Sequence, residues 1–171
     1  QPTLFPYTTL FRSLSAADAR ALGCTGHVAK ASGLAFDLRR DCPYPPYDHF
    51  AVAQVVRTEG DVAARVGVRM REIETALELL DQLLDQVPDG PLAAPFAASA
   101  GSAGIGLVEA WRGEILTFVR FDAAGRVARF FPRDPSWFHW PALERLISGN
   151  IVPDFPVCNK SVNGSYAGAD L

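Results

Sequence analysis

The longest regular pattern in the chain is a run of apolar residues at three- and four-residue steps between Gly60 and Val87. This spacing is typical of an amphipathic α-helix, here about seven turns long. Asp61 is a suitable N-cap, and the sequence Pro-Asp-Gly at 88–90 would end the helix. The periodic residues are Val62, Val66, Met70, Ile73, Leu77, Leu80 and Leu84.

Shorter segments with alternating polarity follow. Residues 107–111, 115–121 and 126–131 are each typical of a strand, and tight turns at 112–114 and 122–125 would join them into an antiparallel β-meander. Residues 91–106 carry no charge and consist mainly of Ala, Gly, Ser and Pro, which predicts a loop or a disordered insertion. Residues 52–58 could form one further short strand.

The first part of the chain contains one clear helix signal. Ser15 and Asp18 have the spacing of a capping box, and Gly23 fits the end of a helix over 15–22. Residues 24–50 are rich in Gly, Pro and Tyr, and the prolines at 43, 45 and 46 favour extended or turn backbone. We therefore expect 24–50 to be irregular.

Near the other end, residues 141–147 predict a short helix, with Pro141 in its first turn and Gly149 just past its end. Residues 150–171 form a mostly polar tail. The resulting fold class is α+β, mainly helical, with one long amphipathic helix and a small antiparallel β-meander.

Composition narrows the class of protein. The chain has 171 residues, of which 49% are apolar and 20% charged, which suits one globular domain or part of a larger one. A net charge of −3 argues against nucleic-acid binding. No apolar run approaches the roughly 20 residues needed to span a bilayer, so any membrane association would come through partner subunits. The cysteines Cys24, Cys42 and Cys158 are odd in number and widely spaced, which favours free thiols.

The first 13 residues have an unusual origin. Residues 3–13, TLFPYTTLFRS, match the codon-by-codon translation of a sequencing adapter. We therefore treat 1–13 as an adapter-derived artefact, exclude it from the fold, and take 14–171 as the domain. A genuine aromatic N-terminal arm is the alternative. On the first interpretation, the natural protein is expected to extend further on its N-terminal side, and the isolated chain to expose apolar patches.

Four blocks of sequence, in order, resemble one family. They are ALGCTGHVAKASGLAFDLR at 21–39, the Pro-Tyr and Gly-Asp segments within 43–65, VEAWRGE at 108–114, and GNIVPD at 149–154 with the tail. The chain resembles the C-terminal part of the family shared by the NiFe hydrogenase large subunit and the D-type subunit of NADH-quinone oxidoreductase, with Lys30 in place of the family's Arg. The resemblance implies a mainly helical fold with a small antiparallel sheet.

The same resemblance bears on metal chemistry. A nickel–iron centre needs soft thiolate ligands. Ser165 and Gly168 align with the two C-terminal cysteines of the hydrogenases, and Cys158 does not restore their spacing. We therefore expect no nickel site. The tail most resembles the group of hydrogenase-related proteins that includes hydrogenase-4 component G, which has also lost these cysteines.

The resemblance also implies functional residues. Asp37 and Arg39 would form a charged wall of a buried cavity, Arg112 would correspond to the arginine over the hydrogenase metal centre, and Glu109 would lie beside it. Each role has an alternative. Asp37 and Arg39 would form a structural ion pair, Arg112 would be an exposed turn arginine, and Glu109 would make a simple cross-strand contact. The residues expected to line the cavity are Asp154, Asn163, Ser165 and His27.

Three functions remain open. The leading one is a large-subunit homologue in a membrane-associated oxidoreductase complex, peripheral on the cytoplasmic side of the inner (plasma) membrane. There it would form a quinone or electron-acceptor cavity with an iron–sulfur small subunit and membrane subunits. The alternatives are a fragment of a true NiFe hydrogenase and a non-catalytic scaffold subunit. No cofactor is expected on this chain itself, apart from a possible quinone; the iron–sulfur clusters and any NAD binding in electron transport would belong to the complex.

Overall fold

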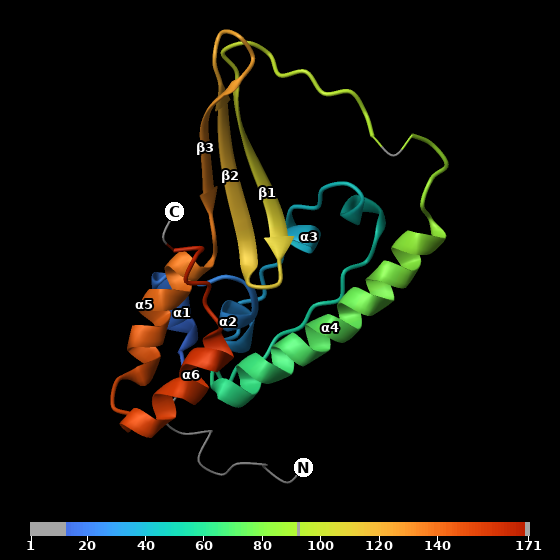
Figure 1. The fold of residues 1–171 in the computed structure, drawn as a ribbon. Coiled ribbons are helices and arrows are strands. Elements are labelled where there is room, and N and C mark those ends of the chain that lie inside the picture. Colours follow the sequence, from blue (N-terminus) through green and yellow to red (C-terminus); the bar gives the residue numbers. More distant parts are fainter. Residues whose placement is uncertain (1–12, 92, 170–171) are drawn as a thin grey trace.

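Four short helices form the main core of the computed structural model, which describes residues 13–91 and 93–169. They are α1 (Ala16–Ala21), α2 (Gly26–Ala31), α5 (Ser136–Ile147) and α6 (Phe155–Val162). Helices from both ends of the sequence thus pack together (Figure 1). The adapter interpretation of 1–13 falls almost wholly outside the described residues. The buried core residues are Leu14, Ala19, Cys24, Val28, Ala29, Ala142, Leu143, Leu146, Cys158 and Val162.

The long helix α4 (Val62–Asp85) begins at its predicted cap, where the Ala64 amide donates to the Asp61 carboxylate at 2.7 Å. Its first turns pack on α2 and α6, and its C-terminal end runs away from the other helices (Figure 1). The apolar periodicity does not mark a buried face. Apart from Val62, the periodic residues are all exposed: Val66, Met70, Ile73, Leu77, Leu80 and Leu84. We call these six residues the α4 stripe.

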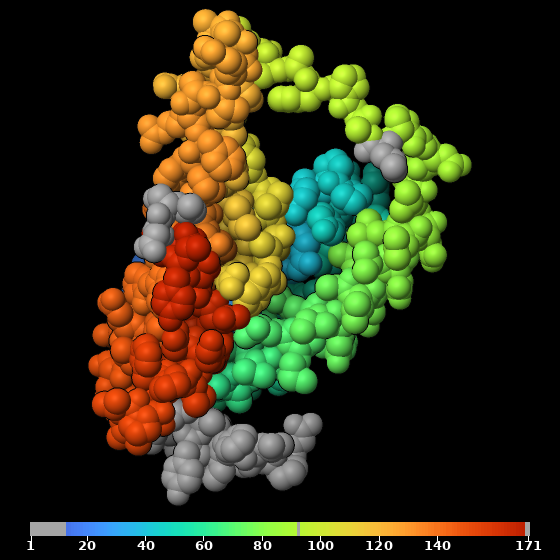
Figure 2. All heavy atoms as spheres, viewed as in Figure 1, coloured from blue at the N-terminus to red at the C-terminus, as the bar shows by residue number. Residues whose placement is uncertain are grey.

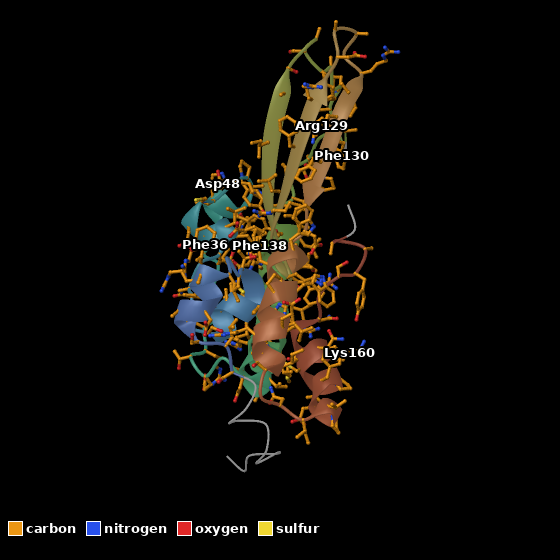
Figure 3. All side chains as sticks on the ribbon, turned by 90° about the vertical axis from the view of Figure 1, so that its left-hand side faces the viewer. Phe36, Asp48, Arg129, Phe130, Phe138 and Lys160 are labelled. Carbon is orange, nitrogen blue, oxygen red and sulfur yellow. The ribbon has the colours of Figure 1, made fainter. Side chains whose placement is uncertain are left out.

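The meander forms as expected. Strands β1 (Ala103–Ala110), β2 (Gly113–Phe121) and β3 (Val127–Arg133) make a three-stranded antiparallel sheet in the order β1-β2-β3. The strand β1 begins four residues earlier than predicted, because residues 103–106 pair with 117–120 although two of them are glycines. The sheet projects beyond the helices, and Phe130 on β3 is exposed there (Figure 3).

Several local predictions were wrong. Residues 24–50 contain α2, α3 (Leu38–Asp41) and a 3₁₀ turn, η1 (Tyr47–His49), rather than irregular chain only. Residues 52–58 form no strand, and the Arg57 amide instead donates to the carbonyl of Lys30 at 2.9 Å.

The second half also differs from its prediction at two places. Helix α5 begins at Ser136, so Pro141 lies inside it rather than in its first turn. The Ser136 amide donates to the Asp134 carboxylate at 2.7 Å, which provides an earlier start. The polar tail contains the turn η2 (Val152–Asp154) and α6.

The predicted N-cap of the first helix is confirmed: the Asp18 amide donates to the Ser15 hydroxyl at 3.0 Å, and Gly23 follows the helix with φ +68°. The Asp18 carboxylate accepts from the Ser15 hydroxyl at 2.7 Å. Within the described ranges, none of the helices combines the length and apolarity needed to cross a bilayer.

Candidate functional site

Two glycines bring the start of α2 against the turn between β1 and β2. Gly26 has φ +56°, and a Cβ there would overlap the Arg112 carbonyl and the Gly113 amide. Gly113 has φ +127°, and a Cβ there would overlap the Thr25 hydroxyl. Both conformations favour glycine, because L-residues with a side chain rarely adopt them. This close backbone approach sets the side chains of α2 beside the end of β1.

A buried ion cluster results from this approach. The Lys30 ammonium, 4% exposed, donates to Asp37 at 2.7 Å and to Glu72 of α4 at 2.6 Å, and lies 3.9 Å from Glu109 of β1. Arg39 binds both oxygens of Asp37, through Nε at 3.0 Å and Nη2 at 2.7 Å. Two cations thus face three carboxylates that come from three separate parts of the chain.

Charge pairing within the cluster outweighs burial for two members. Burial lowers the pKa of Lys30, but Glu72 and Asp37 raise it further, so its pKa lies above the ordinary value. Burial raises the pKa of Asp37, but hydrogen bonds and charges from Arg39 and Lys30 hold it well below the usual range. Both groups therefore stay charged at neutral pH.

Glu109 behaves differently from the other carboxylates. Burial raises its pKa to about 7, and the backbone hydrogen bond from Leu38 and the charges of Lys30 and Arg39 oppose that rise only in part. The Leu38 amide donates to its carboxylate at 3.0 Å. With Glu109 protonated, the two cations of the cluster balance its two remaining carboxylates. Glu109 can therefore take up or release a proton near neutral pH.

A pocket of about 460 Å³ opens beside this cluster. It lies where α3, α4, the end of β1 and the segment after α6 meet, and Figure 2 shows the surface hollowed between α4 and the strands. Charged groups share its wall with apolar ones. The lining residues are Arg39, Arg69, Glu72, Ile73, Ala76, Glu109, Ala110, Trp111 and Asn163.

Trp111 links the pocket to two buried histidines. Its ring stacks on His27 with 5.8 Å between centroids, and His27 meets His139 edge-on at 5.7 Å. Burial lowers the pKa of His27 to about 3 and that of His139 to about 4, so both are neutral at pH 7. Their Nε2 atoms contact backbone carbonyls, at 3.1 and 3.3 Å for His27 and 3.1 Å for His139. We interpret both as packing residues.

The C-terminal segment reaches the pocket at one residue. Asn163 lines it, and its carbonyl accepts a hydrogen bond from Arg112 Nε at 2.8 Å. Ser165 is held instead by α5, through its amide to the Ser136 hydroxyl at 2.8 Å. A Cβ on Gly168 would lie 2.7 Å from Asp134 Cγ.

These positions do not fit the ligands of a nickel–iron centre. Neither Ser165 nor Gly168 lines the pocket, and Gly168 has no room for a thiol side chain. None of the three cysteines lines it either. Across residues 13–91 and 93–169, no group of three or more His, Cys, Asp and Glu side chains is arranged to hold a metal ion.

The structure thus brings together most of the residues singled out in the sequence. Arg39, Glu109 and Asn163 line one pocket. Asp37 supports it from the ion cluster, while Arg112 and His27 contact Trp111 on its wall. Ser165, in the segment after α6, packs against α5 outside the pocket. Asp154 lines a different cavity of about 270 Å³ beside the end of α5. Glu109 contacts Lys30 rather than Arg112.

Sequence reasoning missed the contribution of α4. Arg69, Glu72, Ile73 and Ala76 line the pocket, and Glu72 also completes the ion cluster. Their spacing of three and four residues places them on one helical face, which was a usable signal. The spacing does not show, however, which face of α4 borders the pocket, because that depends on how α4 packs against the rest of the protein.

Comparison with known proteins identifies the fold. The chain is similar to a chain of the membrane-bound sulfane sulfur reductase, an archaeal respiratory membrane complex, with a TM-score of 0.85 and 30% identity over 94% of this chain and 46% of that one. It is 32% identical to the carbon monoxide-induced hydrogenase of Rhodospirillum rubrum, over 95% of this chain and 45% of the relative. It is 33% identical to hydrogenase-4 component G of Escherichia coli, over 80% of this chain and 25% of the relative.

The fold and these similarities together define a protein of the hydrogenase and respiratory large-subunit class. The sequence-family model of the respiratory-chain NADH dehydrogenase 49 kDa subunit matches residues 11–100, more than half of the chain. The chain belongs to this family, which confirms the resemblance seen in the sequence. It spans less than half the length of the relatives named here.

Proposed function

We propose that this chain forms the wall of a quinone or similar electron-acceptor cavity in the large subunit of a membrane-associated redox complex. The observation that carries the proposal is the 460 Å³ pocket, in which Glu109 stands next to a charge-balanced buried cluster. Membership of the 49 kDa subunit family and the likeness to a chain of a respiratory membrane complex support it.

The residues of the pocket suit an aromatic acceptor with polar oxygens. Ile73, Ala76, Ala110 and Trp111 offer apolar contacts for a ring, and charged groups stand on the facing walls. Complete reduction of a quinone consumes two electrons and two protons. We propose that Glu109 supplies a proton to the acceptor, because its pKa of about 7 lets it hold one at neutral pH.

The electrons would come from an iron–sulfur cluster in a partner subunit, since the described residues present no cluster ligands. Attachment to the membrane would likewise occur through partner subunits, on the cytoplasmic side. The packing of Gly168 against Asp134 argues against the alternative of a nickel hydrogenase, because that alternative needs a cysteine at this position.

The test uses the assembled complex that contains the full-length protein. Electron transfer to a short-chain quinone is measured between pH 5.5 and 8.5 for the wild type, Glu109→Gln and Glu114→Gln. Glu114 is the cross-strand partner of Glu109 but lies outside the ion cluster, which makes it the matched control.

We expect the wild-type rate to fall as the pH rises through about 7, because Glu109 then loses its proton. Glu109→Gln should lower the rate about 100-fold, as loss of a general acid typically does, and should flatten this pH dependence. Glu114→Gln should keep both the rate and the profile. A Glu109→Gln complex with wild-type rate and profile would refute the role of Glu109, and failure of a photoreactive quinone to label the pocket residues would refute the cavity.

A further inference from the structure

Two arginines meet over one indole ring at the pocket wall. The guanidinium carbon of Arg69 lies 4.9 Å from the centroid of Trp111, and that of Arg112 lies 4.0 Å from it. Arg69 belongs to α4 and lines the pocket, whereas Arg112 follows β1 and borders it through Trp111 and Asn163. Cation–π contact fixes both groups against the ring.

No carboxylate of the described residues forms an ion pair with either guanidinium. Within the described part of the chain, Arg112 donates one hydrogen bond, from Nε to the Asn163 carbonyl, and Arg69 makes no ion pair or hydrogen bond. Glu72 stands one helical turn from Arg69, but its carboxylate is bound to Lys30 at 2.6 Å. The nearby carboxylates are thus already paired or, in Glu109, partly protonated.

The charges around the pocket therefore do not balance. Lys30 and Arg39 are matched by Asp37 and Glu72, while Arg69 and Arg112 have no carboxylate partner among the described residues. Unpaired guanidinium groups at a pocket wall favour an anion, and their N–H groups suit carboxylate or phenolate-type oxygens. An anionic ligand would supply the missing charge, and its ring would lie on the apolar wall formed by Trp111.

We propose that Arg69, held over Trp111 beside Arg112, makes this pocket selective for planar acceptors that carry a negatively charged oxygen. This inference rests on the acceptor cavity proposed above and specifies its substrate class. Arg69 is the group that touches the ligand, because it lines the pocket. Arg112 adds positive charge close to the ring and holds Trp111 in place by its cation–π contact.

A matched pair of ligands tests the selectivity. The compounds 2-hydroxy- and 2-methoxy-1,4-naphthoquinone share one ring system, but at neutral pH the first is an anion and the second is neutral. Their dissociation constants are measured by calorimetry on the assembled complex. The variants are Arg69→Gln and, as control, Arg71→Gln, which removes an exposed arginine of the same helix that pairs with Glu74 outside the pocket.

We expect the wild type to bind the hydroxy compound about tenfold more tightly than the methoxy compound, as one charge-assisted hydrogen bond provides. Arg69→Gln should abolish this preference and leave the affinity for the methoxy compound within about twofold, which also shows that the pocket remains folded. Arg71→Gln should behave as wild type.

Equal wild-type affinity for the two compounds would overturn the selectivity while leaving the acceptor cavity intact. So would an equal loss of both affinities in Arg69→Gln. If neither compound binds the wild type, both this inference and the acceptor cavity are refuted.

Discussion

Replacing Glu109 by glutamine should change how the stability of the protein depends on pH. The side chain of Glu109 is 4% exposed, and its carboxyl pKa rises from an ordinary value of 4.5 to about 7 on folding. Below pH 4.5 the group is protonated in both the folded and the unfolded chain, so it imposes no penalty. Between pH 4.5 and 7 only the unfolded chain releases the proton, and stability falls as the pH rises.

The size of this penalty follows from the shift. One pKa unit corresponds to about 1.4 kcal/mol, so the shift of Glu109 amounts to about 3 kcal/mol, reached above pH 7. Glutamine keeps an oxygen to accept from the Leu38 amide but does not titrate. The stability of Glu109→Gln relative to wild type should therefore increase by up to about 3 kcal/mol between pH 4.5 and 8.

Urea unfolding followed by tryptophan fluorescence at pH 4.5, 6 and 8 measures this difference. In thermal unfolding it corresponds to a relative gain of roughly 6–12 °C for a chain of this length. Glu114→Gln corrects for the loss of one carboxyl outside the cluster. A constant difference between Glu109→Gln and wild type across this pH range would show that Glu109 is not buried as described, and the reasoning would fail.

Two further predictions concern the backbone contact and the exposed helix. Gly26→Ala should destabilise the protein by several kcal/mol, because Gly26 has φ +56° and the new Cβ would overlap the Arg112 carbonyl. Gly67→Ala has open space around it and should stabilise α4 by up to about 1 kcal/mol. Urea midpoints that shift in the same direction in both variants would contradict this prediction. The exposed α4 stripe should make the isolated chain self-associate. The double variant Met70→Lys/Leu77→Lys should scatter less light than the wild type and keep its unfolding midpoint. Unchanged scattering would show that the stripe is not the contact surface.

The sequence determined those features that depend on residues close together along the chain. The cap at Asp61 and the extent of α4 follow from side-chain hydrogen bonding and helical periodicity. The three strands follow from alternation and from glycine-containing turns. The four sequence blocks also identified the family and directed attention to Arg39, Glu109 and Asn163, which line one pocket.

Only the tertiary structure decided how these parts meet. The helical pattern of α4 did not reveal that its apolar stripe is exposed while Arg65 is buried, because periodicity specifies a face but not what covers it. Residues 24–50 form α2 and α3 although their composition favours loops, because packing overrides weak local preference. The ion cluster beside the pocket brings together Lys30, Glu72 and Glu109 from three distant segments. The pairing of these groups, and the pKa values of Lys30 and Glu109, depend on burial and on distances of a few ångströms, which a linear sequence does not contain.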